Sequence, residues 1–342
     1  MKSIENLVRE NILNLTAYSS ARKEFSGIDG VFLDANENPF GDKNRYPDPY
    51  QKTLKKELSA IKNVPIDSIF IGNGSDEVID LAFRIFCTPG VDKAMTFSPT
   101  YGMYDVSAGI NDIELLKVPL KDNFQMDVKS VEPFLKNKEL KLIFICSPNN
   151  PTGNLLNEED ILFILDNFKG IVFIDEAYID FSSSNSWSEK INQYPNLIIL
   201  QTFSKAWGLA NSRVGFAFSS SYIIHLFNKI KPPYNVSGLN QNSAVSALHN
   251  IENFNKNLQT ILQQKEWLKK ELSQLEIIQK IYPSDANFLL VEVENADFIY
   301  HELVVRGIIV RNRNNIIRNS IRISVGNASE NQKLINALKE II

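Results

Sequence analysis

The sequence predicts an α/β protein in which a mostly parallel sheet is sandwiched by helices and followed by a smaller α+β domain. From about Ile69, short apolar runs alternate with helical stretches. These runs are apolar on both faces, which is typical of parallel strands buried between two helical layers. After about Leu239 the alternation stops, and a long helical pattern leads to strands with a different spacing. This change predicts a second domain.

Apolar periodicity places the elements of the first part in order. Helices are expected at residues 51–62, 76–87, 101–110, 128–136, 158–168 and 222–230. Strands are expected at residues 69–71, 94–97, 115–118, 142–146, 171–174, 197–200 and 214–218. Pro47 and Pro49 keep the segment before the first of these helices extended or turned.

The last hundred residues predict the smaller domain. A long helical pattern runs from 239 to 275, strands are expected at 287–293, 308–311 and 321–325, and helices at 296–306 and 329–342. We therefore divide the 342-residue chain into three parts. These are an amino-terminal arm on the substrate side (1–40), a large α/β domain (41–240) and a small α+β domain (241–342).

Composition restricts the class of protein. The net charge of −4 gives no reason to expect nucleic acid or an anionic membrane as a partner. No apolar stretch is long enough for a signal peptide or a transmembrane helix. Cys87 and Cys146 are expected to be free thiols in a reducing cytoplasm. His225, His249 and His301 are isolated, so no metal site is expected.

Polar residues follow several predicted strands, at the ends where open α/β sheets bind ligands. Gly74, Ser75 and Asp76 open a helix, so their backbone N–H groups suit a phosphate, or the side chains simply cap the helix. Asn150 lies in a loop dense in proline and asparagine. It presents its amide to a ligand or belongs to a tight turn, and Asn150–Pro151 is a candidate cis bond.

Two further strand ends carry an acid and a lysine. Asp175 ends a buried strand, where a carboxylate needs a cationic partner. Tyr178 follows it closely; the alternative for this pair is a helix cap and a half-buried aromatic side chain. Ser204 and Lys205 follow the next strand, and Arg213 lies eight positions later. A Ser-Lys pair by itself is also typical of a surface loop.

One cofactor suits this whole set of residues. Pyridoxal 5′-phosphate is held by a lysine as a Schiff base, with an acid beside its pyridinium nitrogen and a bound phosphate. Asn150 and Tyr178 would hydrogen-bond the ring's 3-oxygen. Ser204, Arg213 and the backbone of residues 74–76 would hold the phosphate, the arginine through a charge-assisted contact.

The motifs resemble those of the fold type I aminotransferases, and more narrowly the histidinol-phosphate aminotransferase family of the class II group. The similarity covers nearly the whole chain. Blocks shared by many aminotransferases are Asn150-Pro151-Thr152-Gly153 and Ser204-Lys205-Ala206. More specific are the blocks at 9–11, 14–18, 33–39, 45–47 and 99–104; the blocks at 175–178 and 321–326 also match.

The resemblance implies a role for each matching residue. Lys205, Asp175 and Tyr178 match catalytic positions, Lys205 being the Schiff-base lysine and Asp175 the partner of the ring nitrogen. Tyr101 matches the aromatic residue that stacks on the ring. Tyr46 matches a tyrosine that reaches the cofactor phosphate of the neighbouring subunit, which implies a homodimer. The implied substrate-side residues are Tyr18, Tyr101, Asn150, Arg311 and Arg322. Asn211 departs from the family, whose members usually carry glycine there; asparagine tolerates a positive φ.

The resemblance also implies an activity. It is transamination of L-histidinol phosphate with 2-oxoglutarate, which gives imidazole acetol phosphate and L-glutamate in histidine biosynthesis. The first alternative is an aminotransferase for phenylalanine or tyrosine, since such enzymes share the cofactor blocks. Two others are a decarboxylase for phosphate-bearing substrates on the same fold and a non-catalytic ligand-sensing module. The chain has no basic patch of the kind that the sensing module's DNA-binding partner domain requires.

Overall fold

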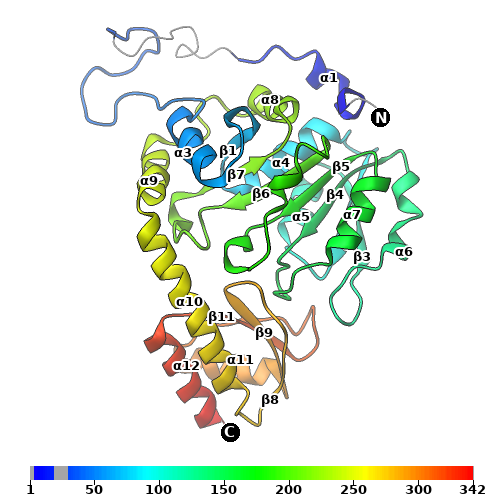
Figure 1. Cartoon of the computed structure of the whole chain (residues 1–342), viewed down its shortest axis with the longest axis vertical. Helices are drawn as coiled ribbons and strands as arrows, with labels where there is room; N and C mark the ends of the chain where they lie inside the picture. Colours follow the sequence, from blue (N-terminus) through cyan, green and yellow to red (C-terminus); the bar gives the residue numbers. More distant parts are fainter. Residues whose placement is uncertain (1–3, 19–29, 342) are drawn as a thin grey trace.

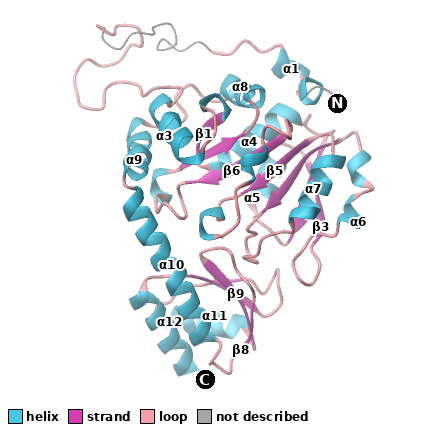
Figure 2. Cartoon of the chain, in the orientation of Figure 1, coloured by secondary structure: helices cyan, strands magenta, loops and turns pink. Residues whose placement is uncertain are grey.

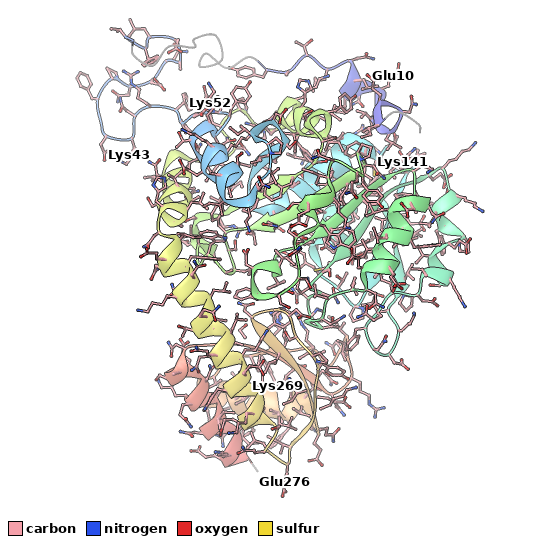
Figure 3. The ribbon with its side chains drawn as sticks, viewed as in Figure 1. Glu10, Lys43, Lys52, Lys141, Lys269 and Glu276 are labelled. Atoms are coloured by element: carbon pink, nitrogen blue, oxygen red, sulfur yellow. The ribbon has the colours of Figure 1, made fainter. Side chains whose placement is uncertain are left out.

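The chain forms two sheets of different size, each covered by helices (Figure 1). The structure is a computed structural model that describes residues 4–18 and 30–341. Part of the predicted amino-terminal arm, residues 1–3 and 19–29, therefore lies outside the described residues. Figure 2 shows the larger sheet inside its helices and the smaller sheet beside the carboxyl terminus. Charged side chains such as Lys43, Lys269 and Glu276 lie at the outer edge (Figure 3).

The larger sheet has seven strands in the order β1-β7-β6-β5-β4-β2-β3. All seven predicted strands are present. Only β7 is antiparallel to its neighbours, β1 and β6; the other pairings are parallel. The strands are β1 (Ile69–Asn73), β2 (Lys93–Ser98), β3 (Glu114–Pro119), β4 (Leu140–Cys146), β5 (Ile171–Asp175), β6 (Leu197–Thr202) and β7 (Val214–Phe218).

The central strands are apolar throughout because each contributes to two cores. Along β4, Ile143 and Ile145 pack into one core, whereas Leu142 and Phe144 pack into the other on the opposite face. The first core is covered by α3 (Lys52–Lys62), α6 (Val128–Val131), α7 (Glu158–Asn167) and α9 (Gly238–His249). The second is covered by α1 (Glu10–Leu13), α4 (Ser75–Phe86), α5 (Met103–Ile110) and α8 (Ser221–Ile230).

Two predicted helices are shorter than the periodicity suggested. The helix expected at 128–136 ends at Val131, and Phe134–Lys136 forms a separate 3-10 turn after Pro133. Proline has no N–H to continue the helical hydrogen bonds. The pattern from 239 to 275 is divided at Asn250 into α9 and α10 (Ile251–Leu272), because this residue leaves the helical region with φ −107° and ψ 48°.

The smaller sheet is antiparallel, in the order β10-β11-β9-β8. Its strands are β8 (Ile278–Ile281), β9 (Phe288–Val293), β10 (Arg311–Asn312) and β11 (Ser320–Ser324). The strand expected at 308–311 starts only at its last residue, and β8 was not predicted, since its half-buried residues give a weak pattern. The smaller sheet shares a core with α10, α11 (Ala296–Val305) and α12 (Ala328–Ile341). Helix α10 connects the two parts of the molecule (Figure 1).

Strand β7 passes very close to the start of α4. A Cβ atom on Gly215 would lie 2.2 Å from the backbone nitrogen of Ser75. Only glycine permits this approach, and it fixes the amino terminus of α4 against the sheet. Gly74, the residue before α4, has a φ of +79°, which glycine adopts readily.

We expect Gly215→Ala to destabilise the protein by about 1–3 kcal/mol, because the added methyl group overpacks this junction. Urea unfolding followed by circular dichroism measures the loss. Gly109→Ala is the matched control: Gly109 lies in α5, and a Cβ atom there would meet nothing outside its own helix within 4 Å. Alanine favours a helix over glycine by about 1 kcal/mol, so the control should be as stable as the parent or more stable. Equal stability of the Gly215 variant and its parent would contradict the packing argument.

Candidate active site

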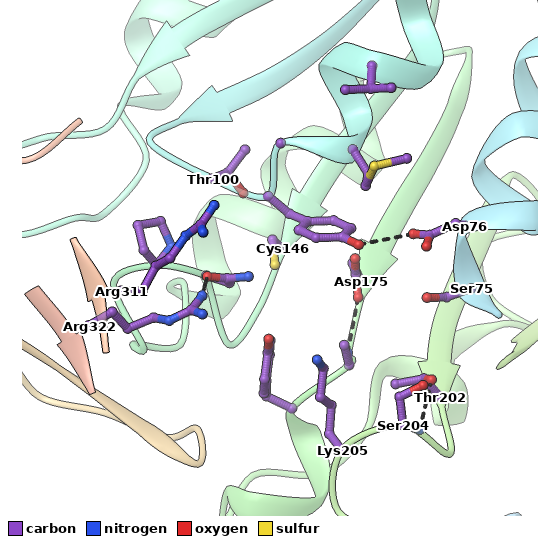
Figure 4. Close-up of a pocket in the computed structure, with 18 of the residues that line it drawn as sticks. Ser75, Asp76, Thr100, Cys146, Asp175, Thr202, Ser204, Lys205, Arg311 and Arg322 are labelled. Atoms are coloured by element: carbon purple, nitrogen blue, oxygen red, sulfur yellow. Dashed lines mark hydrogen bonds between the residues drawn. The ribbon is translucent and has the colours of Figure 1, made fainter. Parts of the chain in front are cut away.

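A cavity of about 590 Å³ lies between the carboxyl ends of the central strands and the β10–β11 hairpin. Figure 4 shows side chains from both parts of the molecule pointing into it. Of the predicted site residues, it is lined by Ser75, Asp76, Tyr101, Asn150, Asp175, Tyr178, Ser204, Lys205, Arg213, Arg311 and Arg322. The fold therefore brings together residues that lie more than two hundred positions apart in the sequence.

Asp175 is the last residue of β5 and is almost completely buried. Its Oδ2 accepts a hydrogen bond from the Tyr104 hydroxyl at 2.7 Å, and its Oδ1 accepts one from the Ala177 backbone at 3.0 Å. Burial raises the pKa of Asp175, although both hydrogen bonds oppose this change. Within the described residues it forms no ion pair, so a cationic ligand group would complete its surroundings.

Tyr104 was not predicted as part of the site. It lies in α5, three residues after Tyr101, and is completely buried with its ring stacked on Phe144. The sequence offers one signal for it, the spacing Tyr101-x-x-Tyr104: Tyr101 lies just before α5 and Tyr104 in its first turn, with their rings edge-to-face at 5.6 Å. A buried phenol needs an acceptor, and Asp175 provides it.

Lys205 follows β6 and remains accessible from the cavity. Partial burial lowers the pKa of its amine, and the positive charge of Arg322 lowers it further, while Asp175 raises it. The amine lies 5.7 Å from the centre of the Tyr178 ring. An accessible lysine with a lowered pKa suits a nucleophile or a proton carrier, because more of it is uncharged at neutral pH.

Arg213 lies over the amino terminus of α4. Its Nη2 is 3.5 Å from Asp76 Oδ2, and a Cβ atom on Gly74 would approach that same Nη2 to 2.7 Å. Glycine thus leaves room for the guanidinium beside the free N–H groups of a helix start, an arrangement suited to phosphate. Ser204 lines the cavity nearby.

The loop before Arg213 differs from the expectation for Asn211. Asn211 lies in a 3-10 turn, Ala210–Ser212, and is not among the residues with a positive φ. Arg213 itself adopts the left-handed conformation, with φ 49° and ψ 45°. A left-handed conformation is unfavourable for arginine, and such local strain is concentrated at functional sites.

Two tyrosines and an amide complete the centre of the cavity. The Tyr101 hydroxyl donates to Asp76 Oδ1 at 3.1 Å. Tyr178 is buried, with its ring edge-on to Phe288. Burial raises the pKa of both phenols, so both remain hydrogen-bond donors at neutral pH. The side-chain oxygen of Asn150 accepts a hydrogen bond from Arg322 Nη1, which leaves its NH₂ group free to donate to a ligand.

The cis bond predicted at Asn150–Pro151 is wrong. The cis bonds of the described residues are Ser98–Pro99 and Ser147–Pro148. The abundance of proline in the loop after β4 correctly suggested a cis bond there, but the sequence alone did not identify which bond it is.

Tyr18 and Tyr46 do not line the cavity. Their side chains are exposed, by 72% and 50% respectively. Tyr46 stacks on Tyr234 with ring centres 4.3 Å apart. Both predicted site residues precede α3 in the sequence, and neither is among the residues that line the cavity.

The residues present fit pyridoxal 5′-phosphate. Asp175, buried and without an ion pair among the described residues, matches a protonated ring nitrogen. The glycine-lined helix start with Arg213 matches the phosphate, and Lys205 lines the same cavity. No group of three or more His, Cys, Asp or Glu side chains suited to a metal is found in residues 4–18 and 30–341. Over the same residues, no helix has the length and apolar character that crossing a membrane requires. Fold and site together define a pyridoxal-phosphate-dependent enzyme of fold type I.

Comparison with known proteins gives the family. The family model for aminotransferase class I and II matches residues 12–338, and the chain belongs to this family. It is 49% identical to the histidinol-phosphate aminotransferase of Cytophaga hutchinsonii, over 98% of this chain and 99% of that protein. It is 50% identical to the histidinol-phosphate aminotransferase of Parabacteroides distasonis, over 100% of this chain and 99% of that protein. The resemblance predicted from the motifs is confirmed.

Solved structures confirm the fold class. Histidinol-phosphate aminotransferase from Sinorhizobium meliloti in complex with pyridoxal-5'-phosphate has a TM-score of 0.81 at 24% identity, covering 88% of this chain and 84% of that one. The enzyme of the same name from Clostridium acetobutylicum has a TM-score of 0.79 at 24% identity, covering 87% and 91%.

We expect Tyr104→Phe to impair the site through Asp175. Without the phenol, the carboxylate loses a hydrogen bond that favours its charged form, so its pKa rises further. The acid limb of the kcat/KM profile for transamination should therefore move to higher pH, and stability should fall by about 1–3 kcal/mol.

The matched control is Tyr222→Phe, a half-buried tyrosine on α8 away from the cavity. It should leave the acid limb in place. If the Tyr104 variant kept both the parental pH profile and the parental stability, the hydrogen bond would have no part in positioning the acid.

Proposed function

We propose that the protein transaminates L-histidinol phosphate with 2-oxoglutarate, using pyridoxal 5′-phosphate, and so takes part in histidine biosynthesis. The products are imidazole acetol phosphate and L-glutamate. The observation that carries the proposal is the cavity itself. It combines a lysine and a buried acid from the large sheet with arginines from the hairpin of the small sheet. Full-length relatives at 49–50% identity that bear the name histidinol-phosphate aminotransferase support the same substrate.

The catalytic residues divide the chemistry between them. The bound cofactor supplies an electron-accepting ring. Asp175 would keep the ring nitrogen protonated by offering a carboxylate in a buried setting. Tyr178 and Asn150 would donate hydrogen bonds to the ring's 3-oxygen. Lys205 would hold the cofactor through its amine and, once freed by the substrate amine, would carry the substrate's α-proton, a role suited to its lowered pKa.

The cofactor phosphate is assigned to the start of α4. Gly74, Ser75 and Asp76 offer backbone N–H groups there, and Ser204 and Arg213 add side-chain donors. Tyr101 lies beside this helix start, held by its bond to Asp76, and is assigned to stack on the ring.

The substrate's anionic group is assigned to the hairpin. The site must accept a phosphate in one half-reaction and a carboxylate in the other. The planar fork of Arg322 suits both, and Arg311 lies opposite it in the strand register. Tyr18 is assigned to the substrate side as well.

A homodimer in the cytoplasm completes the proposal. Tyr46 and Tyr18 are exposed and do not line the cavity of their own chain. In a dimer with two-fold symmetry, the same exposed segment of each subunit can reach the other's site. The two cysteines, Cys87 and Cys146, are free and buried, as suits a reducing compartment.

The first test follows the visible absorption of the loaded enzyme. Histidinol phosphate should remove the absorption of the lysine-bound cofactor, and 2-oxoglutarate should restore it. Lys205→Ala should lack both this absorption and turnover, whereas Lys52→Ala, at the exposed start of α3, should retain both.

The alternatives give different results. A higher kcat/KM for phenylalanine than for histidinol phosphate would replace this proposal with an aromatic aminotransferase. Release of carbon dioxide without an oxo acid would indicate a decarboxylase.

The dimer is tested by mixing two inactive variants. Tyr46→Ala removes the residue assigned to the neighbour's site, and Lys205→Ala removes the reacting amine. After subunit exchange at equal amounts, half of the dimers are mixed and each has one complete site, so roughly a quarter of parental activity should return. No recovery in dimers shown to be mixed would place Tyr46 in its own subunit's site or outside the site altogether.

A further inference from the structure

A third arginine, Arg313, shares the face of the β10–β11 hairpin that lines the cavity. Arg311 lies directly opposite Arg322 in the register of the hairpin. The backbone N–H of Arg313 donates to the carbonyl of Ser320 at 2.9 Å, which continues the same ladder. Residues two apart on a strand point to the same side, and all three arginines line the cavity.

Among the described residues, the guanidinium of Arg313 has no anionic partner. Its Nε is buried and makes no hydrogen bond, and within the described part of the chain no carboxylate pairs with it. Burial lowers the pKa of Arg313 to about 10, and the charges of Arg322 and Arg311 contribute to this change. The group is still charged at neutral pH, so it retains the cost of a partly desolvated, unpaired cation until an anion binds.

Arg322 also has a buried Nε that makes no hydrogen bond, but it differs from Arg313 because the protein already holds one of its terminal nitrogens. Its Nη1 donates to Asn150, and its guanidinium lies over the Phe288 ring at 5.1 Å. Held in this way, its fork suits two-point contact with a carboxylate. A phosphate monoester carries close to two negative charges and three terminal oxygens, so it can engage a further guanidinium at the same time.

We propose that Arg313 binds the phosphate of the phosphorylated amine substrate and contributes little to binding the dicarboxylic amino donor or oxo acid. It is thereby a specificity-determining residue that favours a phosphate monoester over a carboxylate. The inference rests on the proposed function, because it assigns a residue to one of that reaction's two substrates.

The test compares Arg313→Gln with the parent holoenzyme. For histidinol phosphate, kcat/KM should fall roughly 10- to 100-fold, mainly through KM, as for loss of a charge-assisted hydrogen bond. For glutamate it should stay within about threefold of the parent. Arg313→Lys should recover part of the loss because it keeps the charge. In the parent, kcat/KM should also rise with pH as the phosphate loses its second proton near pH 6, and this rise should flatten in Arg313→Gln.

Arg318→Gln is the control, since Arg318 is exposed on the same hairpin and does not line the cavity. It should resemble the parent. Equal losses for both substrates, or no loss for histidinol phosphate, would overturn the assignment of Arg313.

A second experiment needs no histidinol phosphate: inorganic phosphate is tested as an inhibitor of the glutamate half-reaction. If phosphate inhibits Arg313→Gln more weakly than the parent, the assignment of Arg313 is supported; if inhibition is unchanged, the assignment is overturned. Failure of the parent to use histidinol phosphate would overturn the proposed function alone.

Discussion

The burial of Asp175 at the end of β5 is the constraint on which the site depends. A carboxylate without a cationic partner in the protein interior is unfavourable, and the raised pKa of Asp175 reflects this cost. The fold tolerates it because two donors, from Tyr104 and the backbone of Ala177, are fixed by packed elements on either side. The acid is therefore positioned before any ligand binds. In the proposed holoenzyme, a protonated pyridine nitrogen would supply the positive charge that Asp175 lacks.

The second half of the site depends on how the small sheet meets the large one. The hydrogen bond from Arg322 to Asn150 joins β11 to the loop that follows β4. Asn150 is thus shared between the arginine-bearing hairpin and the centre of the cavity. A shift of the small sheet would disturb the amide and the arginine together, so the two sides of the cavity are physically connected.

Much of this arrangement could be predicted from the sequence, because the strands of the large sheet are apolar on both faces and their polar ends are easily recognised. The strand-end residues Asp175 and Lys205 were predicted from that logic, and the structure places them in one cavity. Tyr104 was missed because a helical tyrosine among apolar neighbours has the same pattern as core. β8 was missed because none of its residues is buried: its two end residues are half-buried and the two between them are exposed. The roles of Tyr18 and Tyr46 remain predictions, since their partners would lie on another subunit.

The charge of the cavity explains why these features occur together. Its wall carries more cationic than anionic side chains, and the pKa values of the lysine and of two arginines are lowered by burial and by their mutual repulsion. Such a wall is unfavourable in isolation and becomes favourable only when anions enter. Arg213 lies at the start of α4, whereas three arginines lie on the hairpin, so the cavity offers positive charge at two separate positions. This distribution of charge suits the phosphate-bearing cofactor and the phosphate-bearing substrate of the proposed reaction. The cations concerned are Lys205, Arg213, Arg311, Arg313 and Arg322, against Asp76 and Asp175.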